Sequence, residues 1–220
     1  MTVTIDIVSD VICPWCFLGK RRLDKAIAAL DGTTVDIRWR PFLLDASIPR
    51  QGMPRQLYLE RKFSKERIPG LHAPLKAAGE VEGIAFAFDK ISVTPSTLDA
   101  HRLIRWAHAH DKQHRMAERL FNLYWIEGAD IGKHEVLIKA AVDVGLDGAH
   151  IAGLLGTKAD LDAVLREIRA AAQIGITGVP TFIFANRYAV VGAQPVEVLS
   201  SAIARAGLEG RAGQAASFTS

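Results

Sequence analysis

The sequence feature that most constrains the fold is Cys-Pro-Trp-Cys, from Cys13 to Cys16, placed where a strand should give way to a helix. The 220 residues contain no other cysteine, and two cysteines placed at random would have this spacing roughly once in 100 times. Before the pair, Val3, Ile5 and Ile7 alternate with polar residues as in a strand, and after it apolar residues recur at helical spacing. The pair therefore lies at a strand-to-helix junction.

This junction should make the two cysteines chemically different. Pro14 suits the first helical turn because its fixed φ is already helical and its missing N–H would have no partner there. Cys13 then falls near the N-cap, where unpaired N–H groups and the helix dipole stabilise a thiolate. Cys16 lies one turn further in and should be more buried. We therefore expect Cys13 to attack a disulfide and Cys16 to resolve the mixed disulfide.

Composition excludes several other classes of protein. With 49% hydrophobic residues the chain can bury a core without disulfides. The net charge of +3 is mild and the longest basic run is Lys20-Arg21-Arg22, so we expect no nucleic-acid partner. No stretch approaches the roughly 18 apolar residues of a membrane span, and the N-terminus lacks the basic region of a signal peptide. We expect a cytoplasmic protein, in which a cysteine pair is more often catalytic or metal-binding than structural.

We also expect no bound metal and no organic cofactor. A structural zinc site needs about four ligands, and the only thiols are Cys13 and Cys16. The seven histidines show no spacing that pairs them with each other or with the cysteines as ligands.

The order of the remaining elements predicts an α/β domain with a long helical interruption. A second strand from Val35 to Trp39, ended by Pro41, would complete a parallel βαβ unit. The segment from Leu43 to about Ala78 is rich in proline, glycine and charge, and it predicts a loop with one short helix from Arg55 to about Arg67. From Ser96 the apolar spacing is helical for about eighty residues.

The second informative stretch is Gly-Val-Pro-Thr-Phe, residues 178–182, at the head of a predicted strand. A proline there is confined to an edge or a first position because it cannot donate to the ladder. A hairpin and a last helix starting near Pro195 follow. The tail from Gly207 to Ser220 is small and polar, and we expect it to be frayed or flexible.

These motifs resemble a known family. Cys-Pro-Trp-Cys followed by Phe-Leu-Gly-Lys is similar to the DsbA family of thioredoxin-fold proteins, and more narrowly to its FrnE-like branch of cytosolic dithiol-disulfide oxidoreductases. That branch shares its fold with 2-hydroxychromene-2-carboxylate isomerases and kappa-class glutathione transferases. The resemblance covers Val3 to about Ala206. It implies an α/β thioredoxin fold whose N-terminal βαβ part (1–42) and C-terminal ββα part (173–206) flank a helical insertion with its connecting segments (43–172).

The resemblance also implies site residues. In this family a cis-proline faces the cysteine pair, so the Val179–Pro180 bond should be cis and the backbone of Val179 should contact an extended substrate or glutathione. Pro14, Trp15 and Pro180 are the other predicted substrate contacts around the pair.

His101 is a further candidate for substrate binding. It lies in Ser96-Thr97-Leu98-Asp99-Ala100-His101, which resembles the Asn-Thr-x-x-Ala-His element of the family. Ser96 stands where the family has asparagine, so the hydrogen bond of that amide is missing here.

The function implied is a thiol-disulfide oxidoreductase acting on protein or small-molecule disulfides, with glutathione or another thiol as a co-substrate. One alternative is a glutathione-dependent isomerase or transferase for a small aromatic compound. There the residue at position 13 would activate glutathione and Cys16 would be dispensable, but those relatives commonly carry serine at that position. Another alternative is a polypeptide-binding holdase without thiol chemistry. The sequence leaves a monomer and a homodimer equally open.

Overall fold

The computed structural model describes residues 2–30 and 32–216 and is built around one four-stranded sheet. The strand order is β2-β1-β5-β6, with β1 and β2 parallel and the other two neighbouring pairs antiparallel. The strands and the helices that join and follow them are β1 (Thr2–Ser9), α1 (Pro14–Ala28), β2 (Thr34–Pro41), β5 (Thr181–Phe184), β6 (Tyr188–Val191) and α9 (Val196–Ala216). This arrangement is the βαβ unit and ββα unit of the predicted thioredoxin fold.

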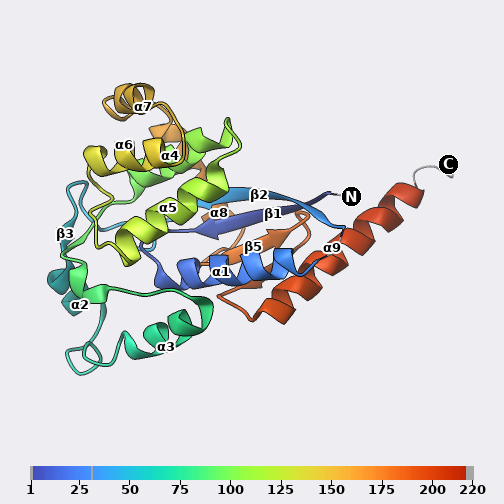
Figure 1. Cartoon of the computed structure of the whole chain (residues 1–220), viewed down its shortest axis with the longest axis horizontal. Helices are drawn as coiled ribbons and strands as arrows, with labels where there is room; N and C mark the ends of the chain where they lie inside the picture. The colour runs from blue at the N-terminus through green and yellow to red at the C-terminus, as the bar shows by residue number, and fades with distance from the viewer. Residues whose placement is uncertain (1, 31, 217–220) are drawn as a thin grey trace.

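The chain between β2 and β5 supplies a mainly helical insertion, also as predicted. Its elements are the two-residue strands β3 (Met53–Pro54) and β4 (Val93–Thr94), the short 3₁₀ helix Phe88–Lys90, and helices α2 (Arg55–Lys62), α3 (Ala73–Glu82), α4 (Leu98–His108), α5 (Gln113–Trp125), α6 (His134–Asp143), α7 (Gly148–Leu155) and α8 (Leu161–Gln173). Figure 1 shows α1 and α9 side by side along one face of the sheet, while α4 to α7 gather at one side of the molecule. The insertion therefore lies beside the sheet and α1.

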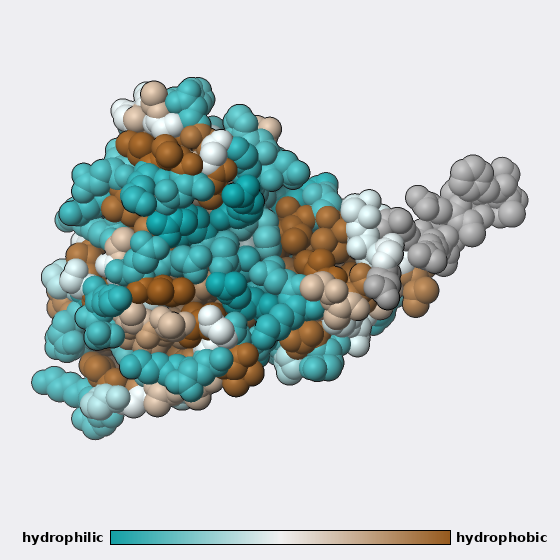
Figure 2. Space-filling view, in the orientation of Figure 1, coloured by the Kyte–Doolittle hydropathy of each residue, from teal (hydrophilic) through white to brown (hydrophobic). Residues whose placement is uncertain are grey.

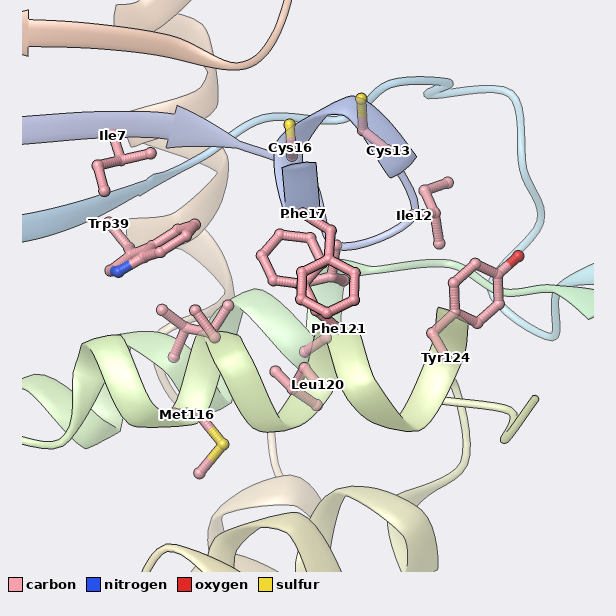
Figure 3. Close-up of a cluster of buried hydrophobic side chains, with 14 of the residues drawn as sticks. Ile7, Ile12, Cys13, Cys16, Phe17, Trp39, Met116, Leu120, Phe121 and Tyr124 are labelled. Carbon is pink, nitrogen blue, oxygen red and sulfur yellow. The ribbon is translucent and has the colours of Figure 1, made fainter. Parts of the chain in front are cut away.

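A continuous core joins the insertion to the sheet. β1 and β5 are largely buried because they are the two inner strands of the sheet. From α1, Phe17 stacks on Phe121 of α5 with ring centroids 5.1 Å apart, and Trp39 of β2 packs on the same ring at 5.9 Å (Figure 3). Each such buried aromatic side chain contributes about 1.5–3 kcal/mol, so α5 is fixed against the helix that carries the cysteines.

One predicted loop is partly helical. The short helix expected from Arg55 is present as α2 but ends at Lys62, and a further helix, α3, follows where we expected irregular chain. The sequence did not predict α3 because a proline usually argues against a helix. Pro74 lies in the first turn of α3, where a missing N–H costs little. Gly83 in the left-handed conformation ends it.

Over residues 207–216 the predicted tail is helical, because α9 continues to Ala216, and its flexibility stays a prediction. The segment contains no proline, so a helix already started at Val196 can propagate through it. Packing against the body ends near Ala206, which is 2% exposed, and Leu208 is 67% exposed. Figure 1 shows the last turns of α9 extending beyond the sheet. The final four residues of the predicted tail, 217–220, lie outside the described residues.

The visible surface is mainly polar. Figure 2 shows a largely hydrophilic face with separate hydrophobic patches, one near α7 and one near β1 and β2. Within residues 2–30 and 32–216, no helix has the length and apolar character needed to cross a membrane.

Candidate active site

The cysteine pair lies at the start of α1, as the sequence predicts. Cys13 is the N-cap residue with extended backbone (φ −93°, ψ 114°), and Pro14 opens the helix. The Cys13 N–H donates to the carbonyl oxygen of Asp10 at 3.0 Å, and the Cys13 carbonyl accepts the Cys16 N–H at 3.1 Å. Both cysteines are free thiols. In Figure 3 both sulfur atoms project to the same side, away from the Phe17–Phe121 stack, so one sulfur can reach the other.

Cys16 is the more protected thiol. It is 1% exposed, and burial raises its pKa well above the ordinary value, with a hydrogen bond to Cys13 and the charge of Cys13 adding to the rise. Cys16 is therefore protonated at neutral pH. Cys13 is 3% exposed but stands beside Trp15, which is 42% exposed. The division into an attacking Cys13 and a resolving Cys16 stays a prediction.

The predicted proline loop lies directly opposite. The Val179–Pro180 bond is cis, and the sulfur of Cys13 lies 3.7 Å from the carbonyl oxygen of Val179. Gly19 allows this approach, since a Cβ at that position would lie 2.9 Å from Cγ of Pro180 and 3.1 Å from Cζ of Phe182. The glycine of the Phe-Leu-Gly-Lys motif thus lets α1 pack directly on the proline loop.

The turn between β1 and α1 is held by groups that the sequence analysis missed. Asp10 is 1% exposed, and its carboxylate accepts the N–H of Leu44 at 2.7 Å and that of Ile12 at 3.4 Å. The indole N–H of Trp125, in α5, donates to the carbonyl oxygen of Val11 at 3.0 Å. A charged residue directly before the apolar Val11 and Ile12 was the sequence signal that could have pointed to these hydrogen bonds of Asp10.

His101 is buried and contacts the cysteine turn through Asp10. It is 5% exposed; its Nε2–H donates to the carbonyl oxygen of Phe42 at 2.9 Å, and Nε2 lies 3.6 Å from Oδ1 of Asp10. The histidine therefore joins α4 to the end of β2 and to the cysteine turn. A direct contact between His101 and substrate stays a prediction. The contacts that His101 makes in the structure position the cysteine turn.

A cavity of about 1000 Å³ lies between β2 and helices α4, α7 and α8. Ser9, Val11 and His101 line its inner end, under the cysteine turn, and the exposed residues His108 and His150 line it further out. The cavity therefore leads from the surface to the last residue of β1. Cys13 and Cys16 do not line it.

Across the described ranges, no cluster of three or more histidine, cysteine, aspartate or glutamate side chains is arranged to hold a metal ion. The chemistry that the site can support with its own residues is that of two neighbouring thiols, one of them buried with a raised pKa, next to the backbone carbonyl of Val179.

The comparisons with known proteins agree with this geometry. Residues 4–204 match the model of the DSBA-like thioredoxin domain. The uncharacterized protein YwbO of Bacillus subtilis (strain 168) is 32% identical over 204 residues, covering 92% of this chain and 96% of that protein.

Solved structures give the same result. A probable DsbA oxidoreductase from Streptomyces coelicolor has 32% identity and a TM-score of 0.84, over 94% of this chain and 91% of that one. The cytosolic disulfide reductase DsbM from Pseudomonas aeruginosa, solved with GSH, has 21% identity and a TM-score of 0.64, over 94% of this chain and 98% of that one. At that identity the second likeness shows the fold alone.

Proposed function

We propose that this chain, which belongs to the DSBA-like thioredoxin domain family, is a thiol-disulfide oxidoreductase acting through Cys13 and Cys16. The observation that carries the proposal is the asymmetry of the two thiols. Cys13 occupies the N-cap position of α1, where the helix dipole favours negative charge, whereas Cys16 is buried and has a raised pKa. Dithiol exchange requires one thiolate that attacks the substrate disulfide and a second thiol that later resolves the mixed disulfide.

The reaction then proceeds in two exchanges. The Cys13 thiolate attacks one sulfur of a substrate disulfide, forming a mixed disulfide and releasing the other sulfur as a thiolate. Cys16 next loses its proton and attacks the Cys13 sulfur, which expels the second substrate thiolate. The substrate has gained two electrons and the protein holds a Cys13–Cys16 disulfide. Glutathione or another thiol returns it to the dithiol, and the same steps run backwards oxidise a substrate.

We propose protein disulfides as the substrates. The carbonyl oxygen of Val179 accepts only from the Cys13 sulfur among the hydrogen bonds of the described residues, so it can accept from the N–H of an extended chain that places its disulfide on Cys13. The exposed Trp15 offers apolar area next to that position. A neighbour of the same fold is named as a cytosolic reductase with GSH, which supports glutathione as the thiol and the cytoplasm as the compartment.

The test is reduction of insulin with glutathione or dithiothreitol as the electron donor. Wild-type protein should turn over, and both Cys13→Ser and Cys16→Ser should fall to background. Ser47→Ala, at an exposed hydroxyl whose partner is Asp45, serves as the matched control and should match wild type. An inactive wild type would contradict the proposal.

The glutathione-dependent isomerase is the second candidate, and the same variants separate it from the first. An isomerase needs only the group at position 13, so Cys16→Ser would keep full turnover of a small aromatic substrate. A holdase would suppress aggregation equally well with both cysteines replaced. The intact pair and the raised pKa of Cys16 favour dithiol exchange over either alternative.

A further inference from the structure

The proposed reaction leaves the Cys16 proton without a route out. Cys16 must become a thiolate before it attacks the mixed disulfide, yet it is 1% exposed and its pKa is raised by burial. Asp10 is a buried base in the same turn, but it acts on the Cys16 thiol through its backbone, while its carboxylate accepts the N–H groups of Leu44 and Ile12. A side chain that reaches both the Cys16 thiol and water would give the proton a route.

Ser9 is a polar residue near Cys16 whose hydroxyl has no hydrogen-bond partner among the described residues. It is the last residue of β1, it is 3% exposed, and Figure 3 shows Cys16 beside the end of that strand. The Ser9 hydroxyl is close enough to the Cys16 thiol to lower its pKa, yet it makes no hydrogen bond to any described residue. Leaving a buried hydroxyl without a partner destabilises the fold, so its presence calls for an explanation.

The explanation lies on the other side of Ser9. The same residue lines the inner end of the cavity between β2 and helices α4, α7 and α8. Exposed charged and polar side chains, among them Asp147 and His150, line the cavity further out, so water can fill it from the surface. Ser9 thus stands between a buried thiol and a polar cavity that opens to solvent.

We propose that Ser9 is a catalytic residue that passes the proton of Cys16 to water in this cavity during resolution of the mixed disulfide, an inference that rests on the proposed dithiol mechanism. The Ser9 oxygen accepts the proton from the Cys16 sulfur as its own proton passes to a cavity water, from which a solvent base removes it. The Ser9 O–H then points back and donates to the new thiolate, which attacks Cys13. No electron moves in this step, and the serine ends unchanged.

The experiment uses 5,5′-dithiobis(2-nitrobenzoate) as the disulfide and the full-length protein. Attack by Cys13 releases one equivalent of coloured thiolate, and attack by Cys16 on the mixed disulfide releases the second, so the two steps are read separately in one trace. In Ser9→Ala the first phase should match wild type. The second should slow about tenfold or more, because a hydrogen bond to a charged group is lost, and its pH midpoint should rise, because Ser9 lowers the pKa of Cys16.

Two control variants separate the loss of the Ser9 hydroxyl from a general effect on the fold. Ser9→Thr retains the hydroxyl and should restore the second phase. Thr94→Val removes another fully buried hydroxyl, one that accepts from Arg55 at 3.4 Å, and should leave both phases unchanged. The other titratable groups around the turn, Cys13, Asp10 and His101, are intact in every variant, so a shifted midpoint reports on Cys16.

The outcomes separate this inference from the function on which it rests. A wild-type second phase preserved in Ser9→Ala, with the same pH midpoint, would overturn the role of Ser9 and leave dithiol exchange standing. A wild type that releases no second equivalent would overturn dithiol exchange itself. A solvent deuterium isotope effect on the second phase of wild type that shrinks in Ser9→Ala would support the relay, since a residue that only packs would not change it.

Discussion

Gly19 is the position where one added methyl group should disturb the site most directly. It lies inside α1, one turn beyond Cys16, where glycine is otherwise unfavourable. An alanine Cβ there would lie 2.9 Å from Cγ of Pro180 and 3.1 Å from Cζ of Phe182, both of which are buried. Because Pro180 and Phe182 belong to the loop and strand that bring Val179 to Cys13, the clash is transmitted to the active site.

The expected change in the free energy of unfolding is the difference of two opposing effects. Alanine favours a helix interior over glycine by about 1 kcal/mol, whereas forcing an extra methyl group into a packed core costs about 1–3 kcal/mol. A proline ring and a fully buried phenylalanine cannot yield as a flexible side chain would, so we expect the upper part of that range. Gly19→Ala should therefore lose about 1–2 kcal/mol, which for a chain of this size lowers Tm by about 2–8 °C.

Gly153→Ala is the matched control, since Gly153 also lies within a helix, α7, but a Cβ there would meet nothing within 4 Å. It should gain about 0.5–1 kcal/mol. Urea unfolding followed by circular dichroism measures both variants, and the rate of the first thiol phase tests the displacement of Val179. Equal stabilisation by the two substitutions, with an unchanged first phase in Gly19→Ala, would refute the reasoning.

Three further predictions concern the helix that carries the cysteines and its supports. Trp125→Phe removes the indole N–H that holds the cysteine turn and should cost about 1–3 kcal/mol in urea unfolding, because a buried carbonyl loses its donor; an unchanged midpoint would contradict this. Lys20 is 5% exposed and forms ion pairs with Asp24 and Glu118. Lys20→Met should lower the free energy of unfolding by about 2 kcal/mol, which is less than the loss expected when both partners are fully buried. Added salt should restore little of the stability lost in this variant. Burial alone would raise the pKa of Asp24, but the hydrogen bond from His114 and the charge of Lys20 outweigh it and hold that pKa below 3.8. This contribution to stability is complete well above pH 3.8 and is lost as pH falls through the lower folded value, so Asp24→Asn should flatten the acid limb of a stability-versus-pH curve.

The parts of the site that the sequence predicted are those fixed by local chemistry. The N-cap position of Cys13 follows from Pro14 and from the strand that precedes it, and the position of Pro180 follows from its missing N–H at the head of β5. The supports of the cysteine turn could not be predicted in this way. Trp125 and His101 lie about ninety residues or more along the chain from the turn that they hold, and tertiary packing alone selects such partners.

The inserted helices therefore do more than cover the sheet. The turn that presents Cys13 is held from α5 by Trp125, from the segment after β2 by Leu44, and from α4 by His101 through the end of β2. A thioredoxin core without the insertion would leave the Asp10 carboxylate with fewer partners and the Val11 carbonyl with none. It would also lose the far walls of the cavity at Ser9. The geometry of the nucleophile and the exit of the Cys16 proton thus depend on the same inserted segment, and this explains why a dithiol confined to residues 13–16 needs helices drawn from the middle of the chain.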